Sequence, residues 1–126
     1  MNDINTIAAW VCVAAGVISG AIGGLFFYRE SWLGGYPSWP RRLVRLGHIS
    51  FFGIGLLNLS YALTIHALDW PAPPMVVSAA LALAGVFMPV ACYLAAWRKP
   101  LRHLFVIPVG CVLIGVVGLL WWRVMP

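Results

Sequence analysis

Charged side chains are scarce in this sequence: they make up 9% of its 126 residues, and only three of them are acidic. Soluble domains are typically about 25% charged and about half apolar. This chain is 63% hydrophobic, and its mean hydropathy is +0.95. Such a composition excludes an ordinary water-soluble domain and indicates a protein whose main solvent is lipid.

Catalytic and metal-binding motifs are missing as well. Only three cysteines are present, each alone in an apolar stretch, and no CxxC pair or zinc-ligand spacing occurs. The sequence contains no GxSxG nucleophile motif, no phosphate-binding loop and no HExxH motif. We therefore expect no disulfide framework, no zinc site and no catalytic activity of the chain's own.

Acidic residues are absent from the interior of every apolar stretch. Asp3, Glu30 and Asp69 all lie at the ends of such stretches. Proton-coupled transport usually depends on a carboxylate within the membrane. This absence therefore argues against a proton-driven transporter.

Long charge-free runs, by contrast, are present at residues 4–28, 46–68, 70–97 and 104–122. A helix needs about 20 residues to cross a hydrocarbon core, and each run can supply them. The runs are apolar all round, which excludes alternating barrel strands. The residues before the first run lack the basic charges that begin a cleaved signal peptide. We predict a single all-α membrane domain over residues 1–126, a four-helix transmembrane bundle with helices over about residues 5–28, 42–67, 74–97 and 101–122.

Basic residues gather at one side of the predicted bundle. Seven of the eight lie in or beside the connections after the first and third helices, and Arg123 is the exception. The positive-inside rule assigns that side to the cytoplasm, so both termini are expected on the non-cytoplasmic side. The net charge of +5 is then a topology signal. We expect a multi-pass protein of the bacterial inner membrane that contacts the lipid bilayer and binds no nucleic acid.

Small residues mark the first predicted helix as a packing surface. Gly16, Gly20 and Gly24 recur every fourth residue, a spacing that lets helix backbones approach closely in lipid. Another helix of the same chain is the favoured partner, and a second copy of the chain is the alternative. The second predicted helix is the most polar and is expected at the centre of the bundle, with Asn58 hydrogen-bonded to a neighbouring helix.

Prolines and short connections constrain the arrangement further. Connections of a few residues make sequence neighbours pack antiparallel. Pro89 and Pro108 lie inside the third and fourth predicted helices, where each removes a backbone hydrogen bond. Kinks are therefore expected in the cytoplasmic half of both helices.

Histidines are the side chains best suited to chemistry within the spans, because ionisable groups in a membrane are costly. His48 and His103 are predicted at similar depth on the cytoplasmic side, where two imidazoles could ligate the iron of a b-type haem. Arg45 would then pair with a haem propionate, and a quinone head group is the alternative ligand. His66 lies on the same helical stripe as His48 but about 27 Å away, so the two cannot share a ligand.

Three functional hypotheses remain from the sequence, of which the last is a structural or assembly factor that binds no ligand. The first is a structural or electron-relaying subunit of a bacterial respiratory or redox membrane complex, with partner membrane subunits and a haem b or quinone site at His48, His103 and Arg45. The second is a small homo-oligomeric four-helix transporter or channel.

Overall fold

The computed structural model describes residues 3–125, which are helical apart from their connections. The elements, in chain order, are α1 (Asp3–Gly24), the 3-10 helix η1 (Trp32–Gly34), α2 (Trp39–Ala67), α3 (Met75–Trp97), the 3-10 helix η2 (Lys99–Phe105) and α4 (Val106–Val124). No strand occurs between residues 3 and 125, which confirms the all-α class.

Four segments are long and apolar enough to cross a membrane, namely Ile4–Gly24, Trp39–Ala67, Met75–Trp97 and Lys99–Val124. Large apolar side chains are exposed on every one of them, for example Trp10, Leu63, Val86 and Val117. In water so much exposed apolar surface would drive association, whereas in a bilayer it is the surface that lipid covers. The chain is therefore a multi-pass membrane protein.

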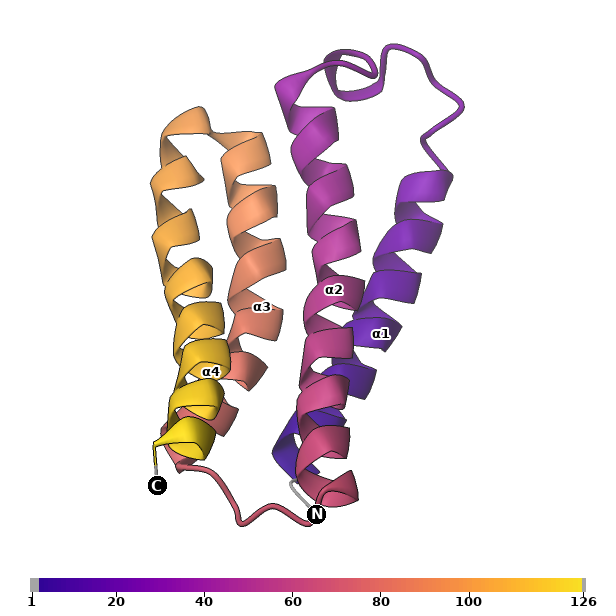
Figure 1. Ribbon diagram of the computed structural model, residues 1–126. Helices are drawn as coiled ribbons and strands as arrows, with labels where there is room; N and C mark the ends of the chain where they lie inside the picture. The colour runs from indigo at the N-terminus through magenta and orange to yellow at the C-terminus, as the bar shows by residue number, and fades with distance from the viewer. Residues whose placement is uncertain (1–2, 126) are drawn as a thin grey trace.

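The helices form an open bundle (Figure 1). α1, α2 and α3 contact one another, whereas α4 contacts only α3 and η2 among the described elements. The most buried helix is consequently α3. Half of the residues in its most apolar stretch (50%) are buried, compared with 28% in the corresponding stretch of α2. This corrects the expectation that the polar second helix is central. The reason is that small residues of α3, such as Ala84, Ala91 and Ala95, let neighbouring helices approach closely.

The two ends of the bundle differ in what they carry. One end holds the connection of residues 25–38 and the α3–η2 junction, and we call it the arginine-rich end. At the opposite end α1 begins, α4 ends and residues 68–74 connect α2 to α3 (Figure 1). We call this the termini end.

Glycines of α1 lie directly under side chains of α2. A Cβ atom on Gly16 would lie 2.8 Å from the Phe52 ring, and one on Gly20 would lie 2.5 Å from the His48 ring. A Cβ atom on Gly24 would have no neighbour within 4 Å. Two of the three glycines in the predicted row therefore pack within the chain.

The connection between α1 and α2 begins earlier than the sequence predicts, because α1 ends at Gly24 and not near residue 28. Residues 25–29 form turns instead, in which Phe26 N–H donates to the Gly23 carbonyl. α2 begins at Trp39, where the Ser38 hydroxyl caps the helix by accepting from Arg41 N–H at 3.3 Å. Pro40 fits the first turn of α2, where no intrahelical N–H is needed.

The two prolines expected inside helices have different positions. Pro89 lies within α3, which continues as one helix from Met75 to Trp97. Pro108 is the third residue of α4, because the preceding residues form η2. N–H groups in a first turn have no intrahelical partner, so Pro108 breaks no hydrogen bond of α4. The expectation that Pro108 removes a hydrogen bond from the interior of the fourth helix is thereby corrected.

Candidate functional site

A groove of about 390 Å³ lies between α1, α2 and α3 in the half nearer the arginine-rich end. Sites for small molecules commonly occupy clefts of about 300 to 1,000 Å³. Its walls are mainly aromatic and aliphatic, and they comprise Ser19, Ile22, Gly23, Phe26, Trp32, Val44, Phe51 and Tyr93. The groove is therefore large enough for one aromatic ring system.

Helical spacing brings these residues to one place. Ser19, Ile22 and Gly23 share one face of α1 through their three- and four-residue spacing, and Phe26 follows in the turn after Gly24. Trp32 of η1 folds back onto that face and stacks on Phe26, with ring centroids 5.8 Å apart and an interplanar angle of 12°. The connection of residues 25–38 thus closes one end of the groove.

The far wall depends on a glycine of α2. A Cβ atom on Gly47 would lie 3.1 Å from the Tyr93 ring, so the absence of a side chain lets this ring lie against the α2 backbone. The Phe51 ring lies next to it, with centroids 6.5 Å apart. The Tyr93 hydroxyl makes no hydrogen bond to the described part of the chain, and it is therefore free to donate one.

The polar group on the α1 wall is Ser19, which is paired with His48. The Ser19 hydroxyl donates to the Gly16 carbonyl at 3.0 Å, and His48 Nδ1 lies 3.2 Å from the same oxygen. Because the single hydroxyl hydrogen is used on Gly16, we assign the proton of this contact to His48 Nδ1, which leaves Nε2 as an acceptor. The His48 ring also packs edge-on against Phe52, at 5.3 Å between centroids.

The residues predicted to form a haem site are not brought together. His48 faces α1, whereas His103 is exposed on η2, which contacts α3 and α4 but neither α1 nor α2 among the described elements. Arg45 lies over the Tyr36 ring, 4.3 Å from its centroid, and belongs to the surroundings of His48 rather than His103. Similar depth in the membrane therefore does not place the two histidines on contacting elements.

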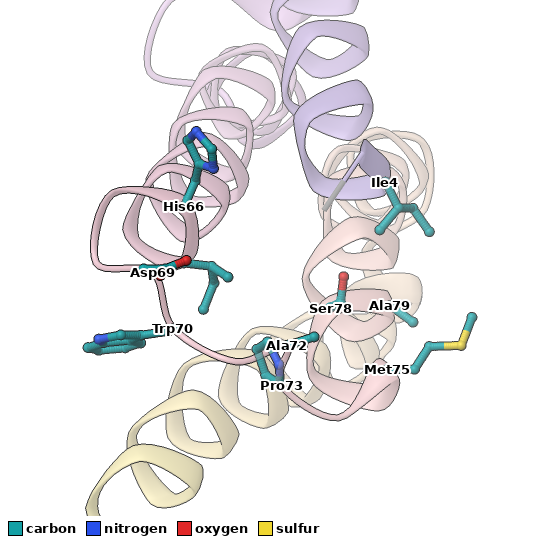
Figure 2. Close-up of a pocket in the computed structure, with 10 residues that line it drawn as sticks. Ile4, His66, Asp69, Trp70, Ala72, Pro73, Met75, Ser78 and Ala79 are labelled. Carbon is teal, nitrogen blue, oxygen red and sulfur yellow. The ribbon is translucent and has the colours of Figure 1, made fainter. Parts of the chain in front are cut away.

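A second pocket, of about 510 Å³, opens at the termini end (Figure 2). His66 and Asp69 lie on its α2 side, and Ser78 lies on its α3 side (Figure 2). Both His66 and Asp69 are exposed, and residues 3–125 contain no group of three or more His, Cys, Asp or Glu side chains suited to hold a metal ion. The pocket is a surface hollow with few converging polar groups.

Beneath that pocket, three buried polar side chains join three helices. The Asn5 amide donates to Asn58 Oδ1 at 2.7 Å and to the Ser78 carbonyl at 3.0 Å. The Ser78 hydroxyl donates to Asn5 Oδ1, and the Asn58 amide donates to the Leu81 carbonyl at 2.9 Å and the Ile54 carbonyl at 3.0 Å. We call Asn5, Asn58 and Ser78 the polar cluster. It joins α1, α2 and α3, as expected for Asn58, and leaves no amide hydrogen aimed at a solute.

Comparison with protein families, with curated proteins and with solved structures finds no match to this chain. The arguments for its function therefore come from its own residues.

Sequence reasoning missed several residues of the groove, above all Tyr93 and Trp32. Tyr93 reads as one apolar position among many in the third span, and Trp32 reads as a membrane-surface aromatic. The available signal was Gly47, which marks the α2 position where a ring from another helix can approach closely.

Proposed function

We propose that this chain is a small non-catalytic subunit of a redox membrane complex and that it binds a quinone head group in the groove between α1, α2 and α3. The single observation that carries the proposal is the aromatic-walled groove with a free Tyr93 hydroxyl. In this proposal the chain lies in the bacterial inner membrane with the arginine-rich end in the cytoplasm.

The chemistry of a quinone matches these walls. Its flat ring can stack on Phe26, Phe51 or Trp32, and its carbonyl oxygen can accept a hydrogen bond from the Tyr93 hydroxyl. His48 acts as a positioning residue, because it fixes the orientation of Ser19 on the opposite wall. The isoprenoid tail is apolar and fits the lipid surrounding an open bundle.

A quinone suits the site better than a haem held by two histidines. His48 is held against Ser19 of α1, whereas His103 is exposed on η2 beside α3 and α4, and this arrangement favours a quinone over a haem held by both histidines. The chain offers no electron donor of its own in this proposal, and neighbouring redox subunits would reduce or oxidise the quinone.

The test is photochemical labelling of the purified protein, in lipid nanodiscs, with a short-chain quinone that carries a photoreactive group. We expect labelled peptides from α1, α2 and α3 around the groove. Tyr93→Phe should weaken quinone binding about fivefold, because one neutral hydrogen bond contributes about 1 kcal/mol.

The matched control is Tyr28→Phe, which makes the same chemical change at an exposed tyrosine that is not a groove residue. It should leave quinone affinity unchanged. Labelling confined to lipid-facing residues, together with equal affinities for the two variants and the unmodified chain, would refute the proposal.

The orientation can be tested separately with single cysteines at exposed positions of the two ends. Ser31→Cys should react with a membrane-impermeant maleimide only from the cytoplasmic side, and Ala72→Cys only from the opposite side. The reverse pattern would invert the proposed topology.

The alternative of a homo-oligomeric transporter is less well supported. Gly16 and Gly20, which the sequence offered to a second copy, lie under Phe52 and His48 of the same chain. A stable homodimer in native mass spectrometry, with solute flux in proteoliposomes, would favour the transporter.

A further inference from the structure

Two arginines at the start of α2 lie close together. Arg41 and Arg45 are one helical turn apart, so they share a face of α2. Their guanidinium carbons lie 5.6 Å and 4.3 Å from the centroid of the same Tyr36 ring. The pair therefore forms one basic site beside the connection of residues 25–38.

Arg41 has a structural role that leaves one donor unused. Its side chain is 4% exposed, and its two Nη groups donate to the carbonyls of Phe27 at 3.2 Å, Arg29 at 3.4 Å and Glu30 at 3.1 Å. Its Nε group is buried without a hydrogen-bond partner. Arg41 thus holds the connection in place, and its positive charge lies beside Arg45 with one N–H group left without an acceptor.

The Arg45 side chain, unlike that of Arg41, makes no hydrogen bond to the described part of the chain. Its guanidinium group lies over the face of the Tyr36 ring. It forms no hydrogen bond or ion pair with the described part of the chain, and its Nη1 atom is buried without a partner. A charged donor that is removed from water and left unpaired is costly. An acceptor from outside the chain that reaches the partly exposed guanidinium group would lower that cost.

No carboxylate within residues 3–125 compensates these two charges. The nearest acidic residue in sequence, Glu30, is exposed and accepts from Arg41 only through its backbone carbonyl. Carbonyl dipoles and aromatic faces attract a guanidinium group but do not neutralise it. The amino-terminal end of α2 adds further positive potential.

We propose that Arg45, with Arg41 beside it, binds the phosphate group of an anionic phospholipid from the leaflet at the arginine-rich end. A guanidinium group matches a phosphate with two parallel hydrogen bonds. Basic sites between transmembrane helices bind such head groups. The bilayer supplies this anion along the whole helix end, whereas a protein carboxylate would require a partner whose surface matches this site. The proposal does not depend on a quinone in the groove.

The experiment measures lipid binding to the delipidated full chain by native mass spectrometry, with phosphatidylglycerol as the probe and phosphatidylcholine as the zwitterionic comparison. Arg45→Gln should weaken phosphatidylglycerol binding about tenfold, because it removes charge-assisted hydrogen bonds. Arg45→Lys should give an intermediate loss, since lysine keeps the positive charge but cannot make the two parallel hydrogen bonds of a guanidinium group. Phosphatidylcholine binding should change little.

Arg42→Gln is the matched control, because Arg42 is exposed on the same helix end and loses the same charge. Equal losses for Arg42→Gln and Arg45→Gln would mean general attraction to the leaflet and would overturn the proposal. Unchanged lipid affinity in Arg45→Gln, with loss of a co-purifying membrane protein, would assign the counter-charge to a partner and also overturn it. If inorganic phosphate alone bound as tightly as the lipid, the site would be one for free phosphate.

Discussion

The two ends of the bundle use buried polar groups in opposite ways. Near the termini end, Asn5, Asn58 and Ser78 donate to one another and to backbone carbonyls. Near the arginine-rich end, by contrast, Arg45 Nη1 and Arg41 Nε are buried without a hydrogen-bond partner in the described chain, and the hydroxyl of the partly exposed Tyr93 makes no hydrogen bond to it. A polar group satisfied within the chain stabilises the fold, whereas one left unsatisfied costs free energy that an added acceptor can reduce.

The largest effect on the fold is expected at the polar cluster. Asn58→Leu removes the hydrogen bond from the Asn5 amide and the two hydrogen bonds that the Asn58 amide donates, and it leaves one hydrogen of the buried Asn5 amide without an acceptor, so we expect the free energy of unfolding to fall by about 2 to 3 kcal/mol. Steric trapping or detergent-induced unfolding in micelles would measure this loss. Ser60→Ala, an exposed polar position on the same helix, is the control and should have no measurable effect. Similar stabilities for both variants would show that the cluster contributes little.

An intermediate effect is expected where α1 meets His48. Gly20→Ala would place a Cβ atom 2.5 Å from the His48 ring, so the ring must shift and its contact with Ser19 must break. We expect a loss of about 1 to 2 kcal/mol from overpacking, with the polar cluster unaffected. Gly24→Ala has open space around its Cβ atom and is the matched control. The measurement is the free energy of unfolding of both variants under the same conditions. Equal values would show that the His48 ring can shift without a loss of stability.

The smallest effect on stability is expected at Tyr93. Its hydroxyl makes no hydrogen bond within the described chain, so Tyr93→Phe should change the free energy of unfolding by less than about 0.5 kcal/mol. The same variant is expected to weaken quinone binding, which separates a binding role from a structural one. A stability loss as large as that of Asn58→Leu would remove the contrast between the two ends.

The membrane spans could be predicted from the sequence because hydropathy and length are properties of each segment alone. All four predicted segments correspond to helices of the structure, although α1 ends earlier than expected. The turns after that end are stabilised by Arg41, whose guanidinium group donates hydrogen bonds to the carbonyls of Phe27, Arg29 and Glu30. Backbone carbonyls are not visible in a sequence pattern, so this turn could not be foreseen.

The candidate site was harder to predict, because depth in a membrane does not fix direction around the bundle. His48 and His103 were placed at similar depth, yet His48 turns toward α1 and His103 lies on η2 beside α3 and α4. Asn58 was correctly expected to bond across helices, whereas its partner Asn5 was not identified. Near a predicted helix start, a polar residue carries no sign that it will be buried.

The peripheral position of α4 bears on how the chain is assembled during synthesis. The hydrogen bonds of the polar cluster involve only α1, α2 and α3, and the last acceptor among them is the Leu81 carbonyl. These hydrogen bonds between the first three helices can therefore form in the bilayer before the fourth helix has left the ribosome. In that order the last helix would dock onto a unit that is already formed, mainly through α3, with Arg123 placed over the Trp70 ring of the α2–α3 connection.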